Sequence, residues 1–381
     1  MKKTRLAAAF LAAGMVMNLA ACGGSGSTTA TTAAAAATTA AAATTAETQG
    51  IVAGSSGSQT MNTGKLVPTA DTKVIQLGHV NASNDQDQYT YFGRQLNDHL
   101  MELSNGKYGI EVVGDSQLGG ERDLFEGLSM GTIDAAILTN LIFNSSIPEA
   151  TILDLPFLYK DVEQGYSTFN DPEILGYMQN ILLNDWNIYA PVYIESGFRK
   201  VMLASKEYEN IDSFKGLKLR VPESPLYLDT FSAIGCAPTT MAASEMYTAI
   251  QQGVVDGNEL PVAGIYSMKY YEICKTMVET NHIYVAGAAC YSKSLWDSLT
   301  EEEKGWFDEA AKLAAEDEKN FVRDTEEAKM KEMAAAGLNI IQPSEEDKQA
   351  FIDATASVYD KYKATVDPEF YSMIMKKIGR E

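Results

Sequence analysis

The sequence predicts an α/β fold made of two similarly built lobes, which strands and one long helix connect. Three observations lead to this prediction. The chain has 381 residues and is 45% apolar, which is enough for two ordinary domains with cores of their own. Strand and helix patterns alternate from residue 73 onward, as they do in sheets with crossover helices. A helix, a glycine, a β-branched pair and an aspartate follow one another twice, ending at Asp134 and at Asp256.

The first lobe is expected to begin with a β-α-β unit. Alternating apolar residues predict a strand at Lys73–Val80 and a second strand at Tyr108–Val113. Between them, apolar residues at helical spacing over residues 92–103 predict a helix, which Asn105-Gly106 ends. The polar loop of residues 81–87 follows the carboxyl end of the first strand, and it is therefore expected to line a binding site.

The middle of the chain continues the alternation. The stretch Leu118–Arg122 leads into a helix that Gly131 ends, and residues 132–137 follow as a strand. Residues 186–195 form an apolar run rich in strand-forming residues and predict another strand. Residues 280–288 predict a strand that returns to the first lobe.

A long helix is expected near the C-terminal end. Thr300 suits the N-cap position, and Glu303, three residues later, completes a capping box. The helical pattern covers residues 301–335, and at 1.5 Å per residue such a helix is about 50 Å long. This exceeds one lobe, so the helix is expected to span both lobes or to break between them. A short strand at residues 339–341 and further helices complete the chain.

The segment Gly216–Pro261 carries the most specific pattern. Residues 217–221 alternate as a strand, Pro222 ends it, and Ser224-Pro225 starts a helix. Arg220 therefore lies at the carboxyl end of a strand, where open α/β sheets bind ligands. Its guanidinium can hold a carboxylate with two parallel hydrogen bonds and does not lose its charge. A salt bridge on the surface or between the lobes is the alternative interpretation.

Two stretches of this segment, GLKLRVPES and GCAPTTMAASEMYTAIQQGVVDGNELP, resemble the substrate-binding subunits of TRAP (tripartite ATP-independent periplasmic) transporters of the DctP type. The resemblance extends from about Val74 to the C-terminus. It implies a two-lobed fold like that of periplasmic binding proteins, class II-like, with hinge strands and a long helix that spans the lobes. The predicted division is lobe I at residues 72–197 and 286–325, and lobe II at residues 198–285 and 326–381.

The resemblance also implies the ligand contacts. Arg220 would clamp the carboxylate of the ligand, and Arg199 would be the second arginine, placed just after the run that resembles the crossing strand of the family. Arg122, in the LGGER stretch, would add charge at the cleft. The predicted ligand-binding residues are Arg220, Arg199, Asn81, Arg122, Thr139, Asn140, Glu223 and Asn258. No catalytic residue, no metal site and no cofactor is predicted.

Two departures from the family pattern limit the choice of ligand. Where the family often has Asp-Gly-Gln-Glu-Asn-Pro, this chain has Leu260 in place of the asparagine. Glu223 follows Arg-Val-Pro, where the sialic-acid binders of the family have asparagine. Sialic acid is therefore disfavoured. A C4-dicarboxylate, a sugar acid or another small organic acid remains open, and Glu223 would bind hydroxyls or a cationic group.

The first 71 residues predict export, an anchor and a tether. Residues 1–22 have a basic start and an uncharged run that is too short for a comfortable membrane span, as in a secretory signal peptide. The ending Leu-Ala-Ala-Cys resembles a bacterial lipobox, which predicts lipidation of Cys22 and a protein held outside the cytoplasm on the membrane. An ordinary signal peptide with a chance cysteine is the alternative. Residues 23–71 are almost wholly Gly, Ser, Thr and Ala and predict a disordered tether.

Charge and cysteine content narrow the function classes. The formal net charge of −21 lacks the basic footprint that nucleic-acid binding needs. Apart from Cys22 the chain has Cys236, Cys274 and Cys290, and free buried thiols are expected, with one disulfide as the alternative. No spacing of cysteine and histidine indicates a metal site.

The leading hypothesis is therefore a solute-binding lipoprotein. It would capture a small organic acid between its lobes and deliver it to the small and large membrane subunits of a TRAP permease. A ligand-sensing extracellular subunit of a signalling receptor is the second hypothesis. A secreted enzyme acting on organic acids is the third, and it is disfavoured because the chain has only three histidines and neither a G-x-S-x-G nor a P-loop motif.

Overall fold

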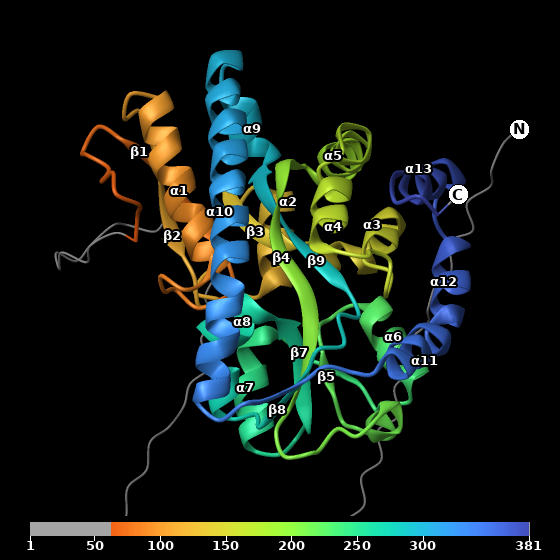
Figure 1. The fold of residues 1–381 in the computed structure, drawn as a ribbon. Coiled ribbons are helices and arrows are strands. Elements are labelled where there is room, and N and C mark those ends of the chain that lie inside the picture. The colour runs from red at the N-terminus through yellow and green to blue at the C-terminus, as the bar shows by residue number, and fades with distance from the viewer. Residues whose placement is uncertain (1–61, 381) are drawn as a thin grey trace, which may run out of the picture. The chain divides into compact units, whose positions relative to one another are not determined.

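The computed structural model describes residues 62–380 (Figure 1). The predicted signal peptide, Cys22 and most of the predicted tether lie outside the described residues. The strands are β1 (Lys73–Gly78), β2 (Tyr108–Val113), β3 (Ala135–Thr139), β4 (Ile188–Leu203), β5 (Arg220–Val221), β6 (Thr239–Thr240), β7 (Gly257–Pro261), β8 (Thr276–Val278), β9 (Tyr284–Ser292) and β10 (Asn339–Ile341).

Helices surround these strands. They are α1 (Gln88–Leu103), α2 (Glu121–Met130), α3 (Pro148–Leu153), α4 (Val162–Phe169), α5 (Pro172–Trp186), α6 (Pro225–Ile234), α7 (Ala243–Gln251), α8 (Val262–Ser267), α9 (Lys293–Ser298), α10 (Glu301–Ala335), α11 (Glu345–Ala354), α12 (Ala356–Lys363) and α13 (Pro368–Lys377), with short 3-10 helices η1 (Asn140–Ser145), η2 (Ile211–Phe214) and η3 (Tyr270–Glu272). No helix of the described part has a stretch both long and apolar enough to cross a bilayer.

The strands form one large sheet in the order β10-β8-β4-β9-β3-β1-β2, and β7 also pairs with β4. Strands β1, β2 and β3 are parallel, as β-α-β crossovers require, whereas β9 runs antiparallel to both β3 and β4. Strands β5 and β6 form a separate parallel pair.

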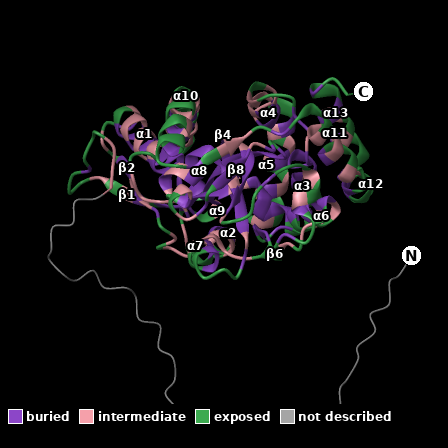
Figure 2. Ribbon diagram, turned by 60° about the horizontal axis from the view of Figure 1, so that its bottom comes forward, coloured by how far each residue is buried: buried purple, intermediate pink, exposed green. Residues whose placement is uncertain are grey.

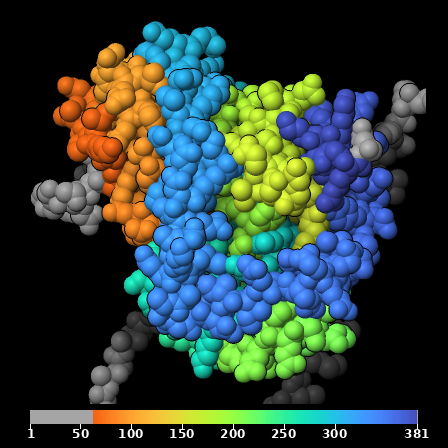
Figure 3. All heavy atoms as spheres, in the orientation of Figure 1, coloured from red at the N-terminus to blue at the C-terminus, as the bar shows by residue number. Residues whose placement is uncertain are grey.

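Strand β4 and helix α10 belong to both lobes. The first part of β4 pairs with β9 in lobe I, and its last residues, 199–203, pair with β7 in lobe II. Helix α10 packs along α1 of lobe I and reaches α8 of lobe II (Figure 1). Figure 3 shows it running down one face of the molecule over both lobes. The prediction of a two-lobed α/β fold with a shared strand and a shared long helix is confirmed.

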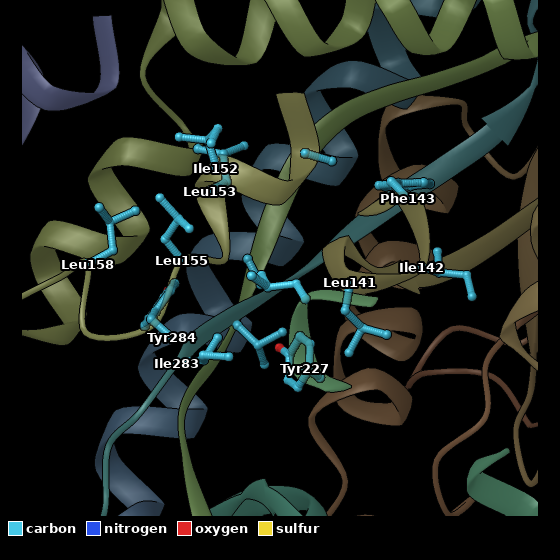
Figure 4. Packing of buried hydrophobic residues seen from close by; sticks show 14 of the residues in the cluster. Leu141, Ile142, Phe143, Ile152, Leu153, Leu155, Leu158, Tyr227, Ile283 and Tyr284 are labelled. Atoms are coloured by element: carbon cyan, nitrogen blue, oxygen red, sulfur yellow. The ribbon is translucent and has the colours of Figure 1, made fainter. Parts of the chain in front are cut away.

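Buried apolar residues lie mainly on the strands and on the inner faces of the helices, as the purple colour in Figure 2 shows. In α1, for example, Phe92, Leu96 and Leu100 have no exposed surface. Burying each such side chain stabilises the fold by roughly 1.5–3 kcal/mol. One apolar cluster joins the lobes behind the cleft, and Figure 4 shows Leu141 of lobe I close to Tyr227 of lobe II within it. The lobes therefore share part of their core.

Most elements lie where the sequence predicts them, and β2, α10 and β10 match their predicted bounds. Strand β4 differs most, because it continues through Arg199 to Leu203 instead of ending near residue 195. Strand β9 starts later than expected, at Tyr284, and β5 has only two residues. The expected free thiols are confirmed, because Cys236, Cys274 and Cys290 are all unbridged.

The ends of the described part also differ from the predicted division of the chain. Residues 62–71 were expected in the tether, but the Asn62 carbonyl oxygen accepts a hydrogen bond from the Val112 amide at 2.8 Å. The Leu66 amide also donates to the Asp98 carboxylate at 2.9 Å. Helix α13, expected in lobe II, packs against α3 and α5 of lobe I. The Lys377 side chain binds the Asp171 carboxylate there at 2.7 Å.

Candidate functional site

A small pocket lies between the lobes. Lobe II contributes Arg220 and Glu223 to its wall, and lobe I contributes Glu121 from the start of α2. Its other lining residues are Val80, Ser116, Gly120, Leu141, Ile142, Pro222, Met241, Ala242, Ala243 and Ser244. The volume is about 30 Å³, room for one or two water molecules. A second hollow of about 400 Å³ shares Val80, Ser116, Ala243 and Ser244 with it and forms the outer part of the same cleft.

Arg220 reaches this pocket because of its local structure. It opens the two-residue strand β5, opposite Thr239 of β6, and Pro222 stops the strand before α6 starts at Pro225. Only 4% of the residue is exposed. Its Nε and Nη2 atoms both donate to the Met241 carbonyl oxygen, at 2.9 and 2.5 Å.

The Arg220 guanidinium lacks a counterion. Among residues 62–380 no carboxylate lies within ion-pair distance of it, and its Nη1 atom has no hydrogen-bond partner. Burial lowers the pKa of Arg220, the nearby Glu259 raises it, and Arg199 lowers it further. A buried guanidinium that only a carbonyl oxygen satisfies is costly to desolvate. The site therefore favours an incoming anion, and a carboxylate matches the guanidinium geometry.

Glu121 is the second charged group of the pocket. The Thr139 amide donates to its Oε1 atom at 3.0 Å, and the Thr139 hydroxyl donates to its two carboxylate oxygens at 2.7 and 2.8 Å. Burial raises the pKa of Glu121, whereas the Thr139 hydrogen bonds and the two arginines, Arg199 and Arg220, lower it. A carboxylate fixed in this way presents hydrogen-bond acceptors to the cleft. Sequence reasoning named its neighbour Arg122 and missed Glu121, although an acidic residue at the first position of a helix beside the cleft was a usable signal.

Arg199 has a counterion of its own. It lies in β4 and is 3% exposed. Its Nη2 atom donates to Glu259 Oε1 at 2.9 Å and to the Glu259 carbonyl oxygen at 2.7 Å, and its Nε atom donates to Oε2. The ring of His282 lies 3.1 Å from Glu259 Oε2. Sequence reasoning did not identify Glu259 as the partner of Arg199.

The charges of this cluster follow from the contacts. Burial opposes the charge on Arg199, but the Glu259 carboxylate outweighs it and raises the pKa of the arginine. Burial likewise opposes the charge on Glu259, yet Arg199 and His282 hold the pKa of that carboxyl below its usual value. Burial lowers the pKa of His282, which keeps the imidazole neutral near pH 7. The cluster is therefore an internally neutralised ion pair.

Of the eight predicted ligand-binding residues, the structure places Arg220 and Glu223 in the pocket wall. Thr139 does not line the pocket, but it donates hydrogen bonds to Glu121, which does. The Asn140 side chain donates to the Ala150 carbonyl oxygen at 2.9 Å, and the buried Asn258 side chain donates to Met246 Sδ at 3.2 Å. Six of the eight lie outside the wall, namely Arg199, Asn81, Arg122, Thr139, Asn140 and Asn258.

A buried carboxyl group of lobe I, that of Asp154, is linked to lobe II through the side chain of Asn144. The Asn144 side-chain amide donates to Asp154 Oδ2 at 3.0 Å and to the Ser224 hydroxyl of lobe II at 3.3 Å. Burial raises the pKa of Asp154 to about 7, while Asn140 and Asn144 lower it. In the described part of the chain no three or more His, Cys, Asp and Glu side chains are grouped to hold a metal ion. The site offers an anion-binding group and acceptors for hydrogen bonds.

Comparison with known proteins places the chain in a family. The family of bacterial extracellular solute-binding proteins, family 7 (DctP), matches residues 77–365. An uncharacterized protein of Haemophilus influenzae is 32% identical over 294 residues, which cover 77% of this chain and 88% of that protein.

Solved structures agree with this match. A TRAP periplasmic solute-binding protein from Haemophilus influenzae with bound L-gulonate has 30% identity and a TM-score of 0.75, covering 81% of this chain and 99% of the other. A TRAP periplasmic solute-binding protein from Polaromonas, bound to D-erythronate, has 26% identity and a TM-score of 0.75, covering 79% and 97% of the two chains. The chain belongs to the bacterial extracellular solute-binding proteins of family 7, the family of the TRAP periplasmic solute-binding proteins.

Proposed function

We propose that the protein captures a small organic acid between its lobes and delivers it to a TRAP-type permease in the membrane. The observation that carries this proposal is the buried guanidinium of Arg220, which has no counterion in the described part of the chain and lies in the wall of an interlobe pocket. A ligand carboxylate would supply the missing charge with paired, charge-assisted hydrogen bonds. The role is binding and release, so turnover of a bound acid by the purified protein would contradict it.

The acidic groups of the pocket favour one class of acid. Glu121 and Glu223 share the wall with a single unpaired cation, Arg220. Their oxygens accept hydrogen bonds from hydroxyls, whereas a second ligand carboxylate would face two like charges with nothing to balance it. We therefore assign the site to a hydroxylated monocarboxylate, such as a sugar acid, before a C4-dicarboxylate. L-Gulonate and D-erythronate, bound to the two solved relatives, are both of this class.

The volume of the pocket implies that the lobes move. At about 30 Å³ the inner pocket holds water but no sugar acid, so the ligand enters through the outer hollow with the lobes further apart. Closure about the shared strand β4 would then remove water from the carboxylate and strengthen its contact with Arg220. The closed form would be the one that docks on the small and large permease subunits.

The remaining predicted residues keep supporting roles in this proposal. Arg199 adds positive potential near the clamp while Glu259 holds it in place. Arg122 is partly exposed, lies next to Glu121 and forms no ion pair in the described part of the chain, so it would attract anions to the mouth of the cleft. Asn81, Asn140 and Asn258 would fix the loops and strands around the pocket. The lipid anchor at Cys22 is a further part of the proposal and would keep the protein on the outer side of the membrane.

A thermal-shift screen of residues 62–381 tests the proposal. L-Gulonate, D-gluconate, D-erythronate, succinate and L-malate are added singly, because a ligand that binds only the folded protein raises its melting temperature. We expect stabilisation by at least one hydroxylated monocarboxylate and weaker or no stabilisation by the dicarboxylates. Calorimetry then compares the wild type with Arg220→Ala and with the control Arg94→Ala, an arginine that pairs with Asp85 outside the pocket. Equal affinity of the wild type and Arg220→Ala would show that Arg220 does not hold the carboxylate of the ligand.

A further inference from the structure

A second set of polar contacts joins the lobes at one end of the cleft. It connects the loop after β1 in lobe I to Ser267, the last residue of α8 in lobe II. The Ser267 hydroxyl donates to Asp87 Oδ2 at 3.0 Å, and the Asn84 side chain donates to the Ser267 carbonyl oxygen at 3.2 Å. Ser267 also lines the outer hollow of the cleft. These bonds therefore form where the two lobes meet around the ligand path.

Asp87 serves both lobes at once. Its Oδ1 atom caps α1 by accepting from the amides of Tyr89 and Thr90, at 2.9 and 3.1 Å. Its Oδ2 atom is the one that reaches Ser267. The cap lies wholly within lobe I, whereas the bond to Ser267 joins lobe I to lobe II. The exposed fraction of Asp87 is 0%, so the closed arrangement removes this carboxyl group from water.

Burial is the largest influence on Asp87 and raises its pKa to about 6, although hydrogen bonds from Thr90, Ser267, Tyr89 and Asn81 lower it. The charged and titratable groups around it come from two helices. Helix α10 contributes Lys329 and Glu318, and α1 contributes Tyr89. The Lys329 ammonium donates to the Gln86 carbonyl oxygen at 3.0 Å.

We propose that Asp87 and Ser267 form a clasp across the cleft, and that this clasp couples closure of the lobes to the uptake of a proton. A serine hydroxyl can hold Asp87 in either protonation state. It donates to the carboxylate, and it accepts from the protonated carboxyl group, so the bond persists while the buried charge is removed. The clasp regulates the capture site described above and rests on that function for its role in transport, but its own test needs no ligand.

The direction of the pH dependence follows from the two states of Asp87. In the open state the carboxyl group regains water and keeps its cap, so its pKa is lower than in the closed state. The closed form therefore binds the proton more tightly. The resulting gain in closure is complete below the open-state pKa and is lost as the pH rises through about 6. Taking an ordinary open-state pKa near 4, the ratio of closed to open protein should be about tenfold higher at pH 5 than at pH 7.

The experiment measures the interlobe distance in the ligand-free protein. Nitroxide labels are placed at Glu126→Cys on α2 and Gln252→Cys at the end of α7, both exposed and on opposite lobes. Burial raises the pKa of the native Cys236 and Cys274 thiols to about 12 and also raises that of Cys290, so the native thiols react slowly near neutral pH. Distance distributions by pulsed electron resonance are recorded from pH 5 to pH 8.

The wild type and three variants are compared. Asp87→Asn keeps the helix cap and mimics the protonated state, because its amide nitrogen can donate to Ser267, so it should stay as closed at pH 8 as the wild type at pH 5. Ser267→Ala should be more open at every pH. The matched control Asp85→Asn lies on the same loop, is exposed and pairs within lobe I, and it should follow the wild type.

The outcomes decide the proposal whether or not the capture site is correct. A wild-type distribution that does not change between pH 5 and pH 7 would refute the proton coupling. An Asp87→Asn protein that opens with rising pH as the wild type does would assign the effect to another group, such as Glu318 or Asp154. Arg220→Ala should retain the pH response of the wild type even if it binds no acid, so failure of the clasp and failure of the clamp give different results.

Discussion

Arg199 and Arg220 are both buried arginines near the same cleft, and they differ in their partners. Arg199 binds the Glu259 carboxylate, and the pair neutralises itself inside the fold. Among residues 62–380, Arg220 has only the Met241 carbonyl oxygen as a hydrogen-bond partner of its side chain. Burial of an arginine therefore does not mark a binding site by itself. Arg220, which has no carboxylate partner among residues 62–380, is the arginine that we propose as the ligand clamp.

The largest effect is expected when the Arg199 pair is broken on one side. Glu259→Ala leaves a buried guanidinium without a counterion, and we expect the free energy of unfolding to fall by about 3–5 kcal/mol. Chemical denaturation measures the change. The double variant Arg199→Met with Glu259→Leu removes both charges and should recover most of the loss. If Glu259→Ala were as stable as the wild type, the Arg199–Glu259 pair would not stabilise the fold.

Substitution of Arg220 should reduce the affinity for the ligand and leave the stability almost unchanged. Arg220→Lys keeps the charge but loses the planar fork, so we expect the affinity for the acid to fall about 10- to 100-fold, the equivalent of about 1.5–3 kcal/mol. The free energy of unfolding of the ligand-free protein should change by less than about 1 kcal/mol, because no ion pair is lost. Calorimetry and denaturation of one preparation measure both quantities. A variant that loses stability but not affinity would reverse the roles of the two arginines.

Glu121 lies in the wall of the same pocket as Arg220, on the side that lobe I contributes. Glu121→Gln keeps the shape and removes a negative charge from the wall that Arg220 shares. We expect the affinity for hydroxylated monocarboxylates to fall severalfold, because a charged acceptor is lost. The affinity for succinate or L-malate should rise relative to them, because repulsion decreases. Competition titrations of the two acid classes against wild type and variant measure the ratio, and an unchanged ratio would remove Glu121 from ligand selection.

Low pH should reduce the stability that the Arg199–Glu259 pair contributes. The pKa of Glu259 is held below its usual value by Arg199 and His282, so its contribution to stability is present at neutral pH and is lost as the pH falls below the ordinary glutamate range. The smallest expected effect is thus a steeper loss of stability below about pH 4 in the wild type than in the Arg199→Met, Glu259→Leu double variant. Melting temperatures recorded from pH 3 to pH 7 make the comparison, and parallel curves would contradict it.

What the sequence could predict depended on how local each feature is. The cap of α10 was predicted because Thr300 and Glu303 are three residues apart, and each accepts a hydrogen bond from the amide of the other, at 3.3 and 2.7 Å. The partner of Arg199 was not predicted, because Glu259 comes near it only through the antiparallel register of β4 and β7. No spacing along the chain encodes that register.

The length of β4 was underestimated for a related reason. Gly197 interrupts the alternation of the strand, and a shift in register between Glu195 and Gly197 marks an irregularity that pattern reading takes for an end. Arg220 was placed by the local strand and helix-start pattern together with the family resemblance, and the LGGER stretch by the resemblance, but Glu121 was overlooked within that stretch. Which acidic residue faces the pocket depends on how α2 meets Thr139, and that is a tertiary contact.

Gly197 also carries a mechanical consequence. It has a φ of 87° at the position where the shared strand leaves one partner strand and is about to join the next. A side chain there would meet open space, with only a Glu326 oxygen 4.0 Å away, so the backbone angle and not crowding requires glycine. We expect a substitution at Gly197 to strain the strand that the two lobes share, and so to change how readily the lobes turn, while every group in the pocket wall stays in place.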